Sequence, residues 1–248
     1  MKDLKDKIIE DFTNYYNNFN VEDNNIKRKY YHSLRVMKFS KEIAYSENLN
    51  ENDIEISIVA GLLHDYARFI QWTKYHTYSD IESIDHGNLG VELLFGQNEI
   101  LKFYTNVKNF DEIYDAIKYH NKHSVPDTLS QHNKKICYIV RDADKLDIFD
   151  IFVTGILDFK EDNAEISEEV KKEFFNNRSI NYSIIKNDND DLILKIAMLF
   201  DLKYKYSVDY IVNNKILEKL YGKIKNKEMF KEYFKYMNDY LLSSNHII

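Results

Sequence analysis

The sequence predicts an all-α protein, and three observations support this fold class. Among the 248 residues only one is proline and six are glycine, so few residues interrupt a helix. Apolar residues recur every three or four positions in several long segments, as one face of a helix requires. Hydrophobic residues make up 44% of the chain, which is enough for a sizeable core. We therefore expect a helical bundle in one domain spanning residues 1–248.

Two amphipathic helices are expected near the beginning of the chain. Residues 4–19 should form a packing helix, because apolar side chains recur along one of its faces. The second helix should cover residues 30–47, with His32, Val36 and Phe39 on its apolar stripe. The steps of four and three residues between them follow the helical period, so His32 is expected to face inward.

The next predicted helix ends at the most informative pair of residues in the sequence. Asn50 stands three residues before Asp53, as a capping residue does at a helix start, and an apolar run then leads to His64. Asp65 follows directly. An imidazole beside a carboxylate is costly to bury in apolar surroundings, and a divalent cation offsets that cost. The pair therefore predicts a metal site.

Further histidines recur at similar places along the chain. Residues 72–85 are polar and aromatic and should form a loop over the end of the preceding helix. His86 then begins a helix, and His120 lies on the apolar stripe of a helix near 110–121. Four of the eight histidines thus fall on inward faces or ends of separate helices, namely His32, His64, His86 and His120. A single buried histidine is more simply a packed core residue, but independent packing explains four of them poorly.

The second half of the chain adds one candidate ligand and a helical extension. A helix after the turn at Pro126 carries Asp142 and Asp144. Two residues apart, they point to different sides of the helix, so only one can readily be a ligand. A C-terminal extension is expected over residues 160–248. Its helices should cover residues 166–176, 191–206 and 208–245.

Charge and cysteine content limit the class of partner. The formal net charge of -7 argues against a surface built to grip a nucleic-acid polymer and favours a small substrate. Cys137 is the single cysteine, which excludes a thiolate metal cluster and favours a reducing compartment. The charged N-terminus leads into no long apolar stretch, so neither a signal peptide nor a membrane partner is expected. We therefore expect a cytoplasmic protein.

Three segments carry a pattern of a histidine, a His-Asp pair and a distal aspartate. These segments start at His32, at Gly61 and at Ala143, in that order. In this pattern the chain resembles the HD-domain superfamily of metal-dependent phosphohydrolases, over a core of about residues 28–150. The segments of His86 and His120 also look like the extra histidine motifs of the family's two-metal branch.

The resemblance implies a set of metal ligands. His32, His64, Asp65 and Asp144 would hold a first ion, with Asp65 as the bridge to a second ion completed by His86 and His120. Asp144 is preferred over Asp142, because the family places this carboxylate after a small residue and before a basic-apolar-acidic run. Imidazoles and carboxylates without sulfur suit Mn, Fe, Co, Ni or Zn, at one or two divalent ions per chain.

The resemblance also implies an activity. The chain would cleave a phosphate ester or anhydride of a small molecule, with a nucleotide as the expected substrate, by a metal-activated hydroxide. Besides Asp65, the candidate catalytic residues are Arg35, Arg68 and Lys145, which could hold the phosphate; for each, pairing with a nearby carboxylate is the alternative. A di-iron oxygenase and a non-catalytic metal- or nucleotide-binding sensor module are the alternative functions. The sequence leaves the substrate, the physiological metal and the oligomeric state open.

Overall fold

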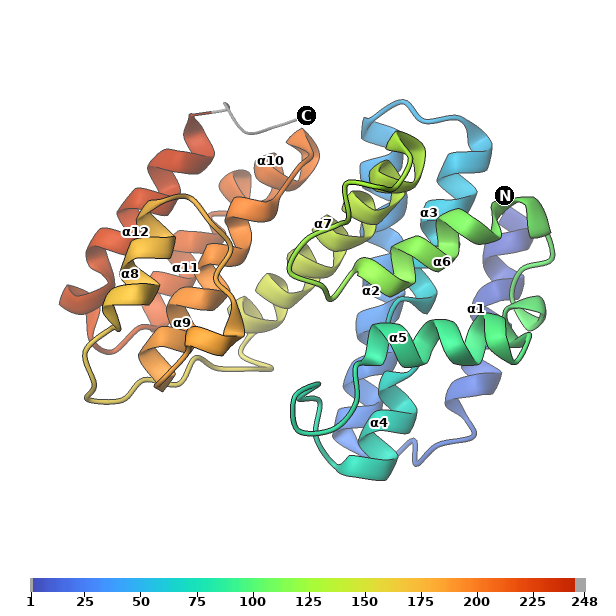
Figure 1. Ribbon diagram of the computed structural model, residues 1–248, viewed down its shortest axis with the longest axis horizontal. Coiled ribbons are helices and arrows are strands. Elements are labelled where there is room, and N and C mark those ends of the chain that lie inside the picture. The colour runs from blue at the N-terminus through green and yellow to red at the C-terminus, as the bar shows by residue number, and fades with distance from the viewer. Residues whose placement is uncertain (1, 244–248) are drawn as a thin grey trace. The chain divides into compact units, whose positions relative to one another are not determined.

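The computed structural model describes residues 2–243, and the side chains of residues 5–243, as helices with short connections (Figure 1). No strand occurs in this described range, which confirms the predicted all-α class. Within the same range, every helix is too short or too polar to cross a lipid bilayer.

The chain divides into two compact units, Met1–Asp144 and Lys145–Ile248. The boundary lies inside helix α7 (Gln131–Thr154), which continues through it without a break. The sequence placed the end of the core slightly later, near residue 150. Because one helix belongs to both units, the prediction of a single domain stays a prediction.

The first unit consists of helices around a central pair. Helices α2 and α3 pack side by side along much of their length, and α6 packs on α3 (Figure 1). A turn of π-helix, Glu92–Gly96, continues α5, and two short 3₁₀ turns lead into α6. The bounds of the α-helices that precede α7 are α1 Lys2–Tyr16, α2 Asn24–Ser46, α3 Glu51–Leu63, α4 Arg68–Tyr75, α5 His86–Val91 and α6 Phe110–Tyr119.

Local sequence explains where the central helices begin. Asp23 caps α2 by accepting a hydrogen bond from the Asn25 amide at 2.7 Å. Asn50 caps α3 by accepting one from the Asp53 amide at 3.0 Å, as its position in the sequence predicts. The apolar run of α3 is buried on all sides, so α3 forms the middle of the unit.

A glycine allows α2 and α3 to approach closely. A Cβ atom on Gly61 would lie 2.9 Å from Ser40 Cβ and 3.3 Å from the Met37 Cα on α2. Both distances are tighter than ordinary packing contacts, so only glycine fits here without a shift of the backbone. The close approach brings the end of α3, with His64 as its C-cap, toward His32 on α2.

The expected loop over residues 72–85 is wrong in its first part. Helix α4 extends to Tyr75, and the chain leaves it at His76, which has the left-handed φ of 53°. The polar residues here suggest a loop, but their side chains form hydrogen bonds with distant parts of the chain. Trp72 Nε1, for example, donates to Asp23 Oδ2 at 2.8 Å. Gln71, fully buried, donates to the following loop at three points.

The single helix expected over residues 208–245 is also wrong. The structure has three helices in its place, and they are α10 Lys205–Asn213, α11 Ile216–Lys223 and α12 Lys227–Leu242. Lys215 takes a left-handed φ of 52°, and the extended backbone at Ile224 ends α11. An apolar side chain is buried at each break, Ile216 at the first and Ile224 at the second. Burial of these side chains in the core therefore decides where the helices end, although the apolar pattern of the sequence is continuous. Residues 244 and 245 of the prediction lie outside the described range.

The second unit contains the remaining helices, which pack around an aromatic cluster. Phe174 is fully buried, and its ring centroid lies 5.1 Å from those of Phe200 and Tyr233. Its helices before α10 are α8 Glu168–Phe175 and α9 Asp188–Ala197, followed by the 3₁₀ turn Met198–Asp201. None of the predicted ligands belongs to this unit, since all of them precede residue 145.

We predict that Gly61→Ala destabilises the first unit. The added methyl group must displace Ser40 or the α2 backbone, which costs about 1–3 kcal/mol of unfolding free energy. Denaturant unfolding followed by circular dichroism measures this cost. Gly96→Ala is the control, because its Cβ would meet only Glu92 Cγ at 3.9 Å; equal stabilities of the two variants would contradict the prediction.

Candidate metal centre

Five helices bring the predicted ligands together in the first unit. His32 lies on α2 and Asp144 on α7, whereas His64 and His120 are the C-caps of α3 and α6. Asp65 follows His64, and His86 is the first residue of α5. The four imidazoles and Asp65 are buried, and the Asp144 side chain is 19% exposed.

The first group of ligand atoms consists of His32, His64 and Asp144. His32 Nε2 lies 3.2 Å from His64 Nε2 and 3.1 Å from Asp144 Oδ1. His64 Nε2 lies 3.7 Å from the same Asp144 oxygen. Ligands 2.0–2.2 Å from a tetrahedral ion are about 3.3–3.6 Å apart, so these three atoms have the spacing of a metal site.

The second group consists of His86, His120 and Asp65. His86 Nε2 lies 2.8 Å from His120 Nε2 and 3.3 Å from Asp65 Oδ1. His120 Nε2 lies 3.6 Å from that same oxygen. The other oxygen of the carboxylate, Asp65 Oδ2, lies 3.3 Å from His32 Nε2 and 3.5 Å from His64 Nε2. Asp65 therefore presents one oxygen to each group, as a bridging ligand does.

Asp142 and Asp144 were alternatives in the sequence, and the structure places them differently. Asp144 belongs to one of the groups of side chains that could hold an ion. A second such group in the described residues joins His64 with Asp65 and His120. Asp142 is fully buried and belongs to neither of these two groups. Asp144 therefore lies where an ion could be held, and its role as the distal ligand stays a prediction.

Hydrogen bonds orient the rings so that Nε2 faces the centre. His64 Nδ1 lies 2.8 Å from the Gly61 carbonyl oxygen, and His120 Nδ1 lies 2.7 Å from that of Ile117. A carbonyl oxygen only accepts, so each Nδ1 carries the proton and donates it. Each Nε2 then offers its lone pair to the centre, which is the tautomer that binds a metal.

Asp80 orients His86 in the same way, although sequence reasoning missed it. Its Oδ2 lies 2.7 Å from His86 Nδ1, and it also accepts hydrogen bonds from Arg68, Gln71 and Asn121. Burial raises the pKa of the Asp80 carboxyl, but the hydrogen bonds and charges around it outweigh burial and hold the pKa below its usual range. Asp80 therefore stays ionised and favours the proton on His86 Nδ1.

The protonation states suit a cation. Burial lowers the pKa of His86 to about 3 and also lowers the pKa of His120, so both rings are neutral at neutral pH. Burial opposes ionisation of Asp65 and Asp144, yet the charge of Lys29 at Asp65 and the neighbouring imidazoles at both carboxyls outweigh it. The pKa of each carboxyl lies well below its usual range. Neutral imidazoles and ionised carboxylates without sulfur fit a borderline divalent metal.

Three basic residues were predicted to hold phosphate. Arg68 lies beside the centre, with Nε 3.4 Å from Asp65 Oδ1. Arg35 is half-buried on α2, and its role stays a prediction. Lys145 is buried, and its Nζ lies 2.8 Å from Asp201 Oδ2, which is the carboxylate pairing that the sequence left as the alternative. Its role in phosphate binding also stays a prediction.

Lys29 is a second residue that sequence reasoning missed. Its Nζ lies 2.6 Å from Asp65 Oδ2, and its side chain is 17% exposed. Lys29 precedes His32 by one helical turn, so the two side chains share a face of α2. This spacing from His32 was the feature of the sequence that could have identified Lys29 as a residue near the centre.

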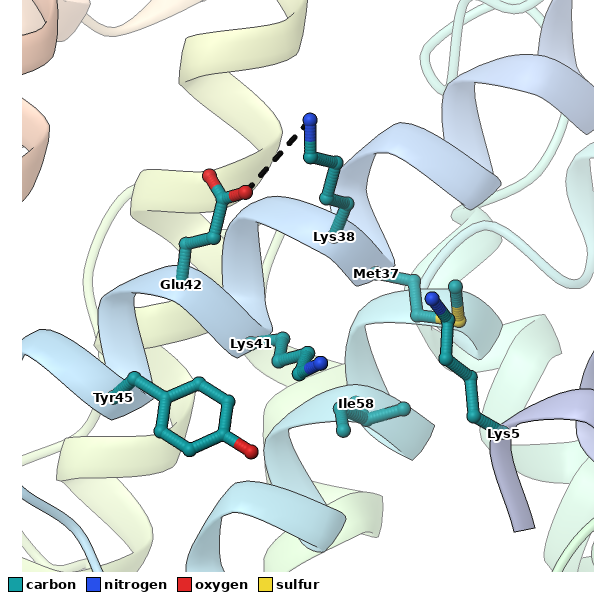
Figure 2. A pocket seen from close by; sticks show the side chains of 7 residues that line it. All are labelled: Lys5, Met37, Lys38, Lys41, Glu42, Tyr45 and Ile58. Carbon is teal, nitrogen blue, oxygen red and sulfur yellow. Dashed lines mark ion pairs between the residues drawn. The ribbon is translucent and has the colours of Figure 1, made fainter. Parts of the chain in front are cut away.

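A cavity elsewhere in the same unit contains none of these ligands. Figure 2 shows Lys5 of α1 and Ile58 of α3 facing the side of α2 that carries Lys41. The cavity has a volume of about 260 Å³. Lys41 Nζ lies 5.3 Å from the centroid of the Tyr45 ring. The remaining residues around the cavity are Met37, Lys38 and Glu42.

Comparison with known proteins gives one match. Residues 30–148 match the family model described as HD domain. The matched segment contains all six predicted ligands, from His32 to Asp144. No curated protein and no solved structure matches the chain.

We predict that Asp80→Asn weakens binding of one of two metal ions per chain by about 10–100-fold, because an amide holds the His86 ring less firmly in its ligand tautomer. Elemental analysis after dialysis against graded chelator measures both affinities. Glu82→Gln, an exposed change in the same loop, is the control. Unchanged metal content in Asp80→Asn would contradict the assignment.

We also predict that the metal-free protein loses stability in acid. The pKa of His86 is about 3 in the folded chain, against 6.5 when unperturbed, so the unfolded chain binds more protons between these values. The unfolding free energy should therefore fall as pH drops below about 6.5, by up to about 1.4 kcal/mol per pH unit per proton. Urea titrations between pH 7 and 4 measure the slope. His86→Gln should flatten it, and an equal slope would contradict the prediction.

Proposed function

Because residues 30–148 form an HD domain, we propose that this chain is a dinuclear phosphohydrolase that cleaves a phosphate ester or anhydride of a small molecule, with a nucleotide as the expected substrate. HD domains are generally metal-dependent hydrolases and bind divalent metals. The observation that carries the proposal is the position of Asp65, each of whose two oxygens faces a different pair of imidazoles. A structural histidine cluster would not need a carboxylate shared in this way.

The residues present fit two divalent ions. His32, His64 and Asp144 would hold one ion. His86 and His120 would hold the other, with Asp65 shared. When bound, two such ions supply a water of lowered pKa as nucleophile and offset the charge on the phosphoryl oxygens.

The chain's own residues would orient the ligands and the substrate. The carbonyls of Gly61 and Ile117 and the carboxylate of Asp80 fix the histidine rings, so little reorganisation is needed when ions and substrate enter. Arg68 Nε is buried and has no hydrogen-bond partner among the described residues. Its ion pair with Asp65 Oδ1, at 3.4 Å, is not a hydrogen bond. A buried guanidinium N–H without a hydrogen bond is costly, and a phosphate oxygen would satisfy it. Arg68 is therefore proposed to bind a phosphate oxygen of the substrate.

We predict that the Mn-loaded protein releases phosphate or a nucleoside monophosphate from at least one member of a nucleotide panel. Asp65→Ala should lower kcat at least about 10³-fold, because it removes a ligand from both ions. Liquid chromatography of the products measures the reaction. Asp127→Ala, which removes a fully exposed carboxylate of the same unit, is the matched control and should leave kcat unchanged.

Two results would overturn the proposal. One is the absence of hydrolysis across the panel with Mn, Fe, Co, Ni and Zn in turn. The other is substrate-dependent oxygen uptake by the iron-loaded protein without phosphate release, which would indicate a di-iron oxygenase.

A further inference from the structure

Three cations surround the ring of Tyr78, which lies in the loop between α4 and α5. The Arg28 and Arg68 guanidinium carbons are each 5.6 Å from the ring centroid, and Lys29 Nζ is 5.3 Å from it. We call Arg28, Lys29, Arg68 and Tyr78 the Tyr78 cluster. Each cation is attracted to the ring, but the three charges repel one another.

Hydrogen bonds fix the position of Tyr78. Its hydroxyl donates to the Asn25 carbonyl oxygen at 2.9 Å, which ties the loop to the first turn of α2. Its carbonyl oxygen accepts from Arg68 Nη1 at 2.6 Å, which ties the loop to the start of α4. The Tyr78 cluster is therefore a built arrangement that joins three segments of the chain.

The Tyr78 cluster borders the candidate metal centre. Lys29 Nζ lies 2.6 Å from Asp65 Oδ2, and Arg68 Nε lies 3.4 Å from Asp65 Oδ1. Two of its three cations thus contact the carboxylate that is proposed to bridge the ions. An anion bound by the Tyr78 cluster would lie next to that centre.

Three carboxylates lie near the three cations of the Tyr78 cluster. Asp65 and Asp80 pair with these cations. The third carboxylate, Asp23, accepts a hydrogen bond from Trp72 Nε1 at 2.8 Å, and its charge acts on Tyr78. Arg28 makes no ion pair in the described part of the chain and donates only to the Asn25 side-chain oxygen, at 3.0 Å. Divalent ions held by Asp65 would neutralise that carboxylate and leave Lys29 without its anionic partner, so that three cations would face only Asp80 and Asp23. Partly buried cations in this state favour the binding of an anion.

A phosphoryl group suits the Tyr78 cluster better than a nucleobase does. The Tyr78 ring already contacts the three cations and Trp72, whose ring centroid is 5.0 Å away, so it is not free to stack on a nucleobase. Guanidinium groups bind phosphate oxygens through two parallel hydrogen bonds. The phosphoryl group that is cleaved would lie at the ions themselves. The Tyr78 cluster is therefore suited to the next phosphoryl group of the same substrate.

We infer that Arg28, Lys29 and Arg68 around Tyr78 form a subsite for a second phosphoryl group, so that the substrate is a nucleoside di- or triphosphate or another molecule with phosphoryl groups in tandem. This inference rests on the proposed function, because that function places the first phosphoryl group at the ions.

Calorimetric binding of two non-hydrolysable probes tests the subsite. The probes are methylenediphosphonate and methylphosphonate, titrated into Mn-loaded protein freed of excess metal, with metal content measured before and after. The wild type should bind the diphosphonate at least about tenfold more tightly than the monophosphonate, because the extra group makes new charge-assisted hydrogen bonds. Arg28→Gln should remove most of this preference, since Arg28 is part of the subsite but does not contact Asp65.

Lys41→Met is the matched control. It removes a cation that also lies against a tyrosine on α2, in the cavity of Figure 2, and it should keep the tenfold preference. Circular dichroism monitors folding, and Lys29→Met is the second variant, with the same expected loss, if Arg28→Gln does not fold. Equal affinity of the wild type for both probes overturns the inference, as does an equal loss of preference in Lys41→Met.

The binding experiment tests the subsite, and the hydrolysis experiment tests the proposed function, so the two can fail independently. A diphosphonate preference in a protein that hydrolyses no nucleotide would refute the proposed reaction and leave the subsite in place. Hydrolysis of nucleotides by a protein without this preference would refute the subsite alone.

Discussion

The burial of the Asp65 carboxylate is the constraint on which the first unit depends. Asp65 is 2% exposed, and an ionised carboxylate at this depth is strongly destabilising unless positive or hydrogen-bonding groups surround it. Lys29 and Arg68 approach it, and imidazole nitrogens approach both oxygens. These partners come from α2, α4, α5 and the ends of α3 and α6, so the carboxylate can be satisfied only when the helices take this arrangement.

Two of the histidines have a structural and a chemical role at once. The last carbonyls of a helix have no partner within the helix, and histidine side chains can satisfy them. His64 and His120 do so through Nδ1, each with the carbonyl three residues before it. The same hydrogen bond that completes the helix end directs Nε2 to the centre. The ends of α3 and α6 therefore explain why two candidate ligands lie where an apolar helix stops.

The sequence predicted well what depends on position along one helix. The inward face of His32, the cap at Asn50 and the end of the apolar run at His64 follow from local rules, and the structure agrees with them. Lys29 and Asp80 were missed for a different reason. Periodicity assigns charged residues to solvent, so it cannot show that Lys29 turns toward a buried carboxylate. Asp80 lies in a loop, where only the folded chain brings it to His86.

The misplaced boundaries have the same origin. Residues 72–75 resemble a loop because they are polar and aromatic, yet Trp72 uses its polar atom on Asp23, which is distant in sequence. The region 208–242 resembles one helix because its pattern is continuous, yet Lys215 adopts a left-handed conformation that lets Ile216 reach the core. Local propensity favours one structure in each case, and long-range packing decides for another.

The loop of residues 76–85 connects the two proposed binding functions. It supplies Asp80, which orients His86, and Tyr78, around which the three cations gather. Arg68 donates to both residues, so the position of one is tied to that of the other. Under the proposed function, an ion at His86 and a phosphoryl group at Arg28 would each favour the same conformation of this loop. Binding free energies that share a conformation are coupled reciprocally, so each ligand should strengthen the binding of the other. The short loop, rather than the helices, would then determine which substrates the centre accepts.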